Sequence, residues 1–152
     1  MTKNIVRKFL IKTVPDLANI TPKHCHKCIL YRDADCELMV QKIGENHEFM
    51  RKTKSSDLGR NEILINISEN EYEWFSKRNI GEVERDEYDL KNNLSIKIYH
   101  GKYSGLIRAE VDFESEEEAK KFKTLDWMGE EISDFPLGRD GNLIKMNESE
   151  FK

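Results

Sequence analysis

Several pairs of charged side chains, two positions apart in this chain, have the types and spacing needed to bind a metal ion or a phosphate group. Arg60 precedes Glu62 in this way, Arg85 lies two residues before a glutamate, and Glu110 is followed by Asp112. Carboxylate oxygens are the ligands that Mg²⁺ and Mn²⁺ prefer, and Lys and Arg side chains hold phosphate groups through charge-assisted hydrogen bonds. In a β-strand, residues two apart lie on the same face, so each pair would reach a common surface.

These side chains suggest two sites. Glu62, Glu110 and Asp112 are candidates for binding one divalent cation, Mg²⁺ or Mn²⁺. The candidates for an anion site are Lys8, Lys52, Arg60 and Arg85. Mutual ion pairing between the acids and the bases explains the same pattern without any ligand, and the sequence leaves both explanations open.

A segment rich in cysteine and histidine, "KHCHKCILYRDADCE", offers a different chemistry. Cys25 and Cys28 have the spacing of one half of a zinc site, and Cys36 with a histidine would have to supply the other half. On a regular strand, however, residues 25 and 28 face opposite sides. We therefore expect no zinc at this cysteine pair.

Apolar residues alternate with polar ones in many short segments, and this period of two predicts β-strands. The predicted strands are residues 3–13, 23–31, 37–43, 47–54, 60–67, 81–90, 94–100 and 105–113. Turn residues separate several of them, namely Gly44, Asn92 with Asn93, and Gly101. Most connections should therefore be short and antiparallel.

Two segments break this alternation and predict helices. Ser68 stands three residues before Glu71, and Ser115 three before Glu118, which is the spacing of a capping box. Tyr72, Phe75 and Trp74 would form the buried side of the first helix, and Ala119 with Phe122 that of the second. The charged stretch "KTKSSDLGR" predicts a loop, and the part from Trp127 onward a wrapping segment with a short terminal helix.

About eight antiparallel strands with only two clear helices must close on themselves or cover their edges. Charge at alternate positions of several strands favours closure, because a barrel with a polar lumen and an apolar outer surface accounts for it. The fold class predicted is therefore α+β, an eight-stranded antiparallel closed β-barrel, or tunnel, with flanking helices. Residues 1–152 would form a single domain.

Composition excludes several classes of protein. Lys and Arg number 25 and Asp and Glu 29, for a net charge of -4, and the two signs are interleaved along the chain. No nucleic-acid-binding surface is indicated. No apolar run approaches the roughly 20 residues of a membrane span, and a signal-peptide pattern is absent. Three cysteines indicate no disulfide framework, so we expect a cytoplasmic protein.

The chain resembles the CYTH superfamily, the triphosphate tunnel metalloenzymes, from Asn4 to about Leu143. The segments that carry the resemblance are "RKFLIK", "KIG", "RNEIL", "SENEYE", "GLIRAEVDFESEEEAKKF" and "DWMGEEIS". The resemblance implies an eight-stranded tunnel in which acidic residues hold a divalent cation and basic residues clamp a triphosphate. Water would then attack the terminal phosphorus.

The first half of the chain departs from the family pattern at several positions. The two glutamates and the lysine with which the family opens fall on Asn4, Val6 and Lys8. The paired arginines of the third strand fall on Met39 and Gln41. Lys52 matches the lysine of the fourth strand, with Lys54 as the alternative register. The fifth strand keeps Arg60 and Glu62 and has Leu64 in place of a second glutamate.

In the second half of the chain, some positions keep the residue of the family pattern and others do not. A family lysine and arginine become Arg85 and Glu87, and an acidic pair becomes Ser95 and Lys97. Glu130 replaces a basic residue, and only Glu110 with Asp112 keeps its pair intact. The inward set would then be Lys8, Lys52, Arg60, Arg85 and Lys97 against Glu62, Glu87, Glu110 and Asp112. Such a lumen could neutralise itself by ion pairing.

Three functions are consistent with this pattern. The first is a CYTH-like protein that binds a phosphorylated small molecule or inorganic polyphosphate and has lost most metal-dependent hydrolysis. The second is a divergent Mg²⁺- or Mn²⁺-dependent triphosphatase acting on inorganic, thiamine or nucleoside triphosphate. The third is a non-catalytic scaffold that contacts a protein partner with its outer face.

Overall fold

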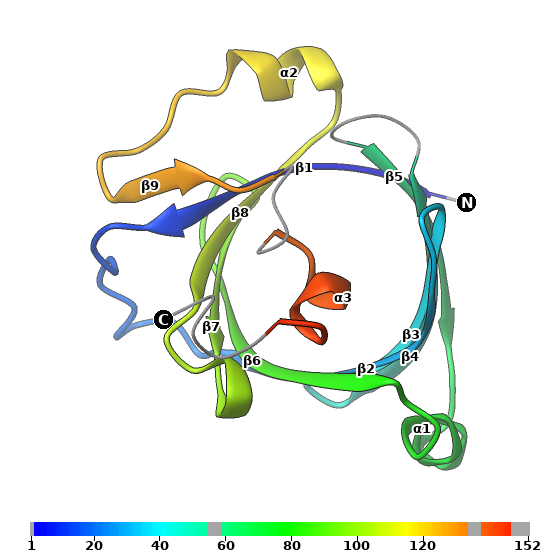
Figure 1. The fold of residues 1–152 in the computed structure, drawn as a ribbon. Helices are drawn as coiled ribbons and strands as arrows, with labels where there is room; N and C mark the ends of the chain where they lie inside the picture. The colour runs from blue at the N-terminus through cyan, green and yellow to red at the C-terminus, as the bar shows by residue number, and fades with distance from the viewer. Residues whose placement is uncertain (1, 55–58, 134–137, 147–152) are drawn as a thin grey trace.

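The computed structural model describes residues 2–54, 59–133 and 138–146, with side chains from Ile5 onward, and its main feature is a closed antiparallel β-barrel (Figure 1). The strands are β1 (Thr2–Ile11), β2 (Lys23–Arg32), β3 (Cys36–Ile43), β4 (Asn46–Lys54), β5 (Gly59–Asn66), β6 (Gly81–Asp89), β7 (Leu94–Tyr99), β8 (Ile107–Phe113) and β9 (Met128–Glu131). The helices are α1 (Glu69–Ser76), α2 (Glu116–Lys121), α3 (Asp140–Leu143) and the short 3-10 helix η1 (Gly101–Tyr103).

Strand β1 closes the barrel. The strands follow the order β5-β4-β3-β2-β6-β7-β8-β1-β9, and β1 also pairs with β5. One edge of β1 pairs with β8, while the other edge is shared: its first residues, Thr2–Ile5, pair with β5, and the end of the strand pairs with β9. Eight strands therefore form the ring, and β9 is a ninth strand added beside it.

The eight strands predicted from the alternating pattern are all present, and their bounds agree closely with the prediction. Asn92 and Asn93 adopt left-handed backbone conformations, with φ of 63° and 59°, in the tight turn between β6 and β7. Asn is among the few residues that accept this conformation, which explains the turn. The segment expected to wrap the barrel instead begins with β9. Of the predicted loop, residues 52–60, the two ends belong to β4 and β5, and residues 55–58 lie outside the described residues.

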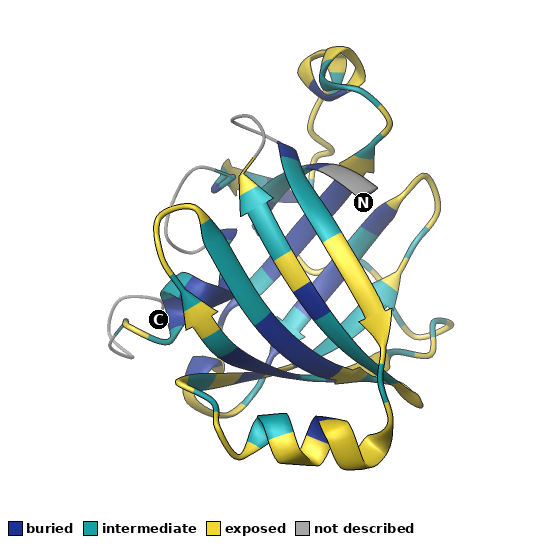
Figure 2. Ribbon diagram, turned by 90° about the vertical axis from the view of Figure 1, so that its right-hand side faces the viewer, coloured by how far each residue is buried: buried dark blue, intermediate teal, exposed yellow. Residues whose placement is uncertain are grey.

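Helices α1 and α2 pack on the outside of the barrel. Ser68 and Glu71 form the predicted capping box at the start of α1, and the Ser115 side chain accepts a hydrogen bond from Glu118 N at the start of α2. Tyr72 is buried against the barrel, and the rest of α1 is largely exposed (Figure 2). Trp74 was expected on the buried side but is 54% exposed, because it lies on the outer side of this short helix.

The described part of the C-terminal segment, residues 138–146 with α3, lies inside the barrel rather than around it (Figure 1). Leu143 packs against Val83 and Tyr99 in one buried cluster, and Ile144 also contacts Ile29 in another. A Cβ atom at Gly141 would come within 2.5 Å of a Glu37 carboxylate oxygen, so a larger residue at this point of α3 would require the Glu37 side chain to move. Leu143 of α3 and the following Ile144 thus anchor this segment to the strands of the barrel.

Candidate functional site

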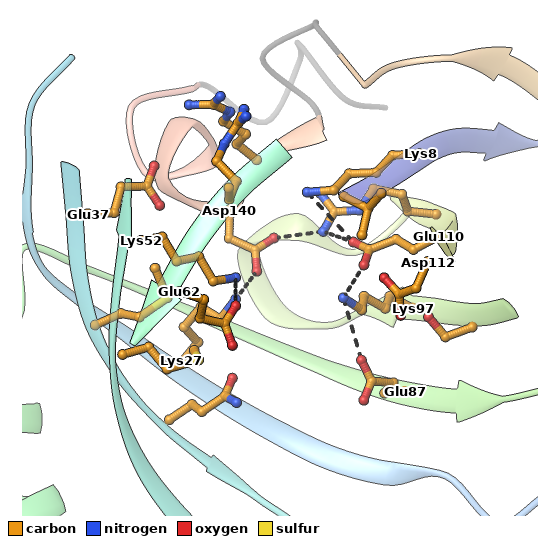
Figure 3. Close-up of a pocket in the computed structure, with 18 of the residues that line it drawn as sticks. Lys8, Lys27, Glu37, Lys52, Glu62, Glu87, Lys97, Glu110, Asp112 and Asp140 are labelled. Atoms are coloured by element: carbon orange, nitrogen blue, oxygen red, sulfur yellow. Dashed lines mark hydrogen bonds and ion pairs between the residues drawn. The ribbon is translucent and has the colours of Figure 1, made fainter. Parts of the chain in front are cut away.

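The interior of the barrel is a cavity of about 630 Å³, within the usual range for small-molecule sites. Figure 3 shows charged side chains from several strands pointing into it. All four predicted anion-site residues and all three predicted cation-site residues line this cavity: Lys8, Lys52, Arg60, Arg85, Glu62, Glu110 and Asp112. Period-two alternation within each strand places them there. Their roles toward a ligand stay predictions.

Glu110, on β8, is surrounded by cations. Lys97 Nζ lies 2.6 Å from one carboxylate oxygen, and Arg108 Nη2 lies 2.8 Å from the other. Lys8 Nζ is 3.9 Å away. Burial acts to raise the pKa of Glu110, but the attraction of Lys97 and the neighbouring cations outweighs it and holds the pKa well below its usual range. Glu110 is therefore ionised and fully paired.

Lys8 and Lys52 have fewer partners than Glu110. Lys52 Nζ is 3.7 Å from Glu62, and Lys8 Nζ donates a 2.6 Å hydrogen bond to Gly138 O. Burial lowers the pKa of Lys8 well below its usual value. Burial, together with the nearby Lys27, lowers the pKa of Lys52 to about 8. An anion in the lumen would stabilise the protonated form of both lysines.

Asp140, at the start of α3, occupies a cluster of basic residues. Arg85 and Lys27 both contact its Oδ2, Lys27 at 2.9 Å. Arg108 Nη2 lies 3.2 Å from Oδ1, and the Tyr99 hydroxyl donates to the same oxygen at 2.5 Å. Burial acts to raise the pKa of Asp140, but Arg85 and the other cations hold it well below its usual range. The lumen therefore already contains a bound anion, a carboxylate of the chain itself.

The three predicted metal ligands are not arranged as a metal site. Both oxygens of Glu110 face cations, and Glu62 faces Lys52. Asp112 is exposed to the lumen, where loss of solvation and the neighbouring Glu110 carboxylate raise its pKa. Across the described ranges, the one group of three ligand-type side chains within 4.8 Å of one another lies elsewhere. The three carboxylates therefore do not converge on one point in this structure, and their role in binding a hard cation stays a prediction.

The charges of the lumen balance. Among the described residues that line the cavity there are nine Lys or Arg and nine Asp or Glu side chains. The sequence predicted five against four, because it did not include several charged residues of the strands, such as Lys27 and Arg108, or those of the turns and of the C-terminal segment. The described side chains that line the cavity therefore carry no net charge. The side-chain Nε of Arg85 is nevertheless buried without a hydrogen-bond partner in the part of the chain that the structure describes.

Sequence reasoning missed Lys27, Arg108 and Asp140. For Lys27 and Arg108 a signal was available, because Lys27 lies two residues after the inward Cys25 and Arg108 two before Glu110. For Asp140 no local pattern existed. Its position depends on the C-terminal segment entering the barrel, which alternation within the strands does not determine.

In the cysteine-rich segment, Cys25 and Cys28 face opposite sides of β2, which is the geometry that argues against zinc at this cysteine pair. Cys25 Sγ lies 3.4 Å from Gln41 Oε1, on the lumen side. Cys28 packs with Val40 and Tyr72 under α1, on the outer side. Cys25 and Cys28 therefore cannot share a metal ion.

The fold and the lumen define the class of protein, an eight-stranded tunnel lined by charged residues of both signs. No protein-family model matches the chain. An inorganic triphosphatase from Nitrosomonas europaea is 29% identical over 136 residues, which cover 86% of this chain and 89% of that protein. The crystal structure of the inorganic triphosphatase NE1496 has a TM-score of 0.68 and 26% identity, and the match covers 96% of this chain and 97% of that one.

A conserved hypothetical protein from Pyrococcus furiosus shares the fold, with a TM-score of 0.56 at 17% identity over 79% of this chain and 85% of that one. Together with the closed tunnel, these likenesses support the resemblance of the chain to the CYTH superfamily. None of the described helices has the length and apolar character needed to cross a membrane.

Proposed function

We propose that the lumen binds a triphosphate-type anion, in a phosphorylated small molecule or in inorganic polyphosphate, through Lys8, Lys52, Arg60 and Arg85. The buried Asp140 carboxylate is the observation that carries the proposal. It is bound by Arg85, Lys27 and Arg108, and a carboxylate held by three cations supports an anion site at this end of the cavity. The remaining cavity is large enough for a longer anion that meets the other cations.

Reduced hydrolysis is the second part of the proposal. Hydrolysis that depends on a cation needs carboxylates with free oxygens converging on one point. Here Glu110 and Glu62 face lysine and arginine, and Asp112 alone of the three has no ion pair among the described residues. Replacement of the opening glutamates by Asn4 and Val6 acts in the same direction.

A triphosphatase is the second candidate, because the similar protein from Nitrosomonas europaea is named an inorganic triphosphatase. For this chain to act likewise with Mg²⁺ or Mn²⁺, the substrate would have to draw Lys97 or Lys52 away from Glu110 or Glu62. The two candidates thus differ in whether the ion pairs of the lumen rearrange when an anion binds.

Binding is tested by titrating inorganic tripolyphosphate into the protein with a chelator present, using calorimetry. We expect saturable binding, weakened about 10- to 100-fold by Arg60→Ala, because a charge-assisted hydrogen bond is lost. Arg51→Ala is the matched control, since Arg51 is exposed on the neighbouring strand, and it should bind as wild type. Absence of binding with or without metal would leave the scaffold function.

Hydrolysis is tested by phosphate release from tripolyphosphate with Mg²⁺ or Mn²⁺. We expect little or no steady turnover. Turnover that is lost in Asp112→Asn but kept in Glu45→Gln would instead establish the triphosphatase. Asp112 is preferred to Glu110 for this test because it is exposed and unpaired, so the variant should fold, and Glu45 is exposed in a turn away from the lumen.

A further inference from the structure

A second cluster of ligand-type side chains lies on the outer face of the barrel, beneath α1. His26 and Cys28 on β2 and Glu82 on β6 bring a nitrogen, a sulfur and an oxygen together. His26 Nε2 lies 3.6 Å from Glu82 Oε1 and 3.9 Å from Cys28 Sγ, and the sulfur lies 3.9 Å from the same glutamate oxygen. The lumen residues discussed above take no part in it.

Sheet geometry accounts for the convergence. His26 and Cys28 are two residues apart, so they share the outward face of β2. Cys28 and Glu82 are directly opposite each other in the antiparallel pairing of β2 with β6. Side chains in this relation lie on the same face and within reach of one another. The backbone thus fixes all three positions.

Tyr72 orients the histidine. Its hydroxyl lies 2.6 Å from His26 Nδ1 and donates to His26 O at 3.4 Å. With its proton directed to that carbonyl, the hydroxyl oxygen accepts from Nδ1–H. In this tautomer Nε2 carries a lone pair, directed toward Cys28 and Glu82. A hydrogen bond on the outer ring nitrogen is the usual support of a metal-bound histidine.

We propose that His26, Cys28 and Glu82 form a binding site for zinc or a similar transition-metal ion. In a tetrahedral zinc site with bonds of about 2.0–2.3 Å, ligand atoms are roughly 3.4–3.6 Å apart. The nitrogen–oxygen separation of 3.6 Å lies at the upper end of this range, and the two separations from the sulfur, both 3.9 Å, exceed it by a few tenths of an ångström. The thiolate and imidazole ligands select zinc over Mg²⁺ or Ca²⁺, which require oxygen ligands.

The proposed site differs from the cysteine-pair site that the sequence disfavoured. It uses one cysteine, not two, and leaves the fourth ligand position to solvent, which the 52% exposed Glu82 side chain borders. Binding would release the Cys28 thiol proton to solvent and form a metal–sulfur bond. Through Tyr72, the ion would also fasten α1 to the barrel.

Cobalt(II) is the probe, since its bond to a thiolate gives a charge-transfer absorption that oxygen ligands do not produce. We expect this absorption when Co²⁺ is added to chelator-treated protein, and its displacement by Zn²⁺. Cys28→Ser should abolish it and Cys36→Ser should keep it. Asp112→Asn, in the lumen, should also keep it, which separates this site from any metal bound there.

If the Cys28 variant does not fold, two other variants still test the proposed site. Glu82→Gln should weaken Co²⁺ binding at least tenfold, whereas Glu84→Gln, the next outward residue on β6, should not. Tyr72→Phe should weaken it about 10- to 100-fold through loss of the support to His26. A missing thiolate band in wild-type protein, or a band that persists in Cys28→Ser, would overturn the proposal.

Discussion

At the scale of single residues, burial and neighbouring charges of opposite sign shift the pKa values of the side chains in the lumen in opposite directions. Lys52 illustrates this balance, because burial and the like charge of Lys27 lower its pKa to about 8, while Glu62 acts in the opposite direction. Glu110 shows the reverse case, since its neighbouring cations outweigh burial. The cations of the lumen therefore differ in how readily they respond to a ligand.

Affinity for tripolyphosphate should fall as the pH rises through about 8. Below this pKa Lys52 is protonated and attracts the anion, and above it the amine is neutral. We expect a loss of severalfold to tenfold between pH 7 and 9 at constant ionic strength, measured by calorimetry. Lys52→Met should show a flatter profile. An affinity equal at both pH values in wild type would contradict this role.

At the scale of elements, short helices depend on their ends. In α1, the Ser68 hydroxyl accepts from Glu71 N at 3.1 Å and the Glu71 carboxylate accepts from Ser68 N at 2.9 Å. In α2 only the serine half is made, because the Glu118 carboxylate accepts from Glu114 N instead. Helix α1 therefore gains more from its cap than α2 does.

Ser68→Ala should destabilise the protein by about 1 kcal/mol, because the backbone N–H of Glu71 loses its side-chain acceptor at the helix start. The midpoint of thermal unfolding should fall by about 2–4 °C. Ser76→Ala is the control, since the Ser76 hydroxyl only bonds within the last turn of the same helix. Equal unfolding midpoints for the Ser68 variant and wild type would show that the cap contributes nothing.

At the scale of the whole molecule, α3 and the barrel supply opposite charges to one buried cluster. The ring brings Lys27, Arg85 and Arg108 together, and α3 supplies the carboxylate that neutralises them. Without Asp140 these buried cations would repel one another. The same contact gives an entering phosphate group a competitor of like charge.

Asp140→Asn should cost about 3–5 kcal/mol of stability, because it leaves buried cations without their counter-ion. Tripolyphosphate or sulfate should restore much of this loss, so the thermal shift on adding the anion should exceed that of wild type. Asp126→Asn, at an exposed aspartate, should behave as wild type. If anions stabilise Asp140→Asn no more than wild type, the basic cluster is not an anion site.

The sequence by itself determined the strands, the caps of α1 and α2 and the inward direction of the candidate residues. These follow from local rules: a period of two fixes the face of a strand, and a serine three residues before a glutamate fixes a helix start. Lys8, Arg60 and Glu110 line the lumen for this reason.

Tertiary structure alone decided which of the inward groups meet. The pairing of Glu110 with Lys97 and Arg108 depends on the stagger of the strands, and the seat of Asp140 depends on a distant segment entering the barrel. The meeting of Cys28 with Glu82 likewise required the register between β2 and β6. Contacts between residues far apart in sequence are set by packing of the whole chain, which no local pattern encodes.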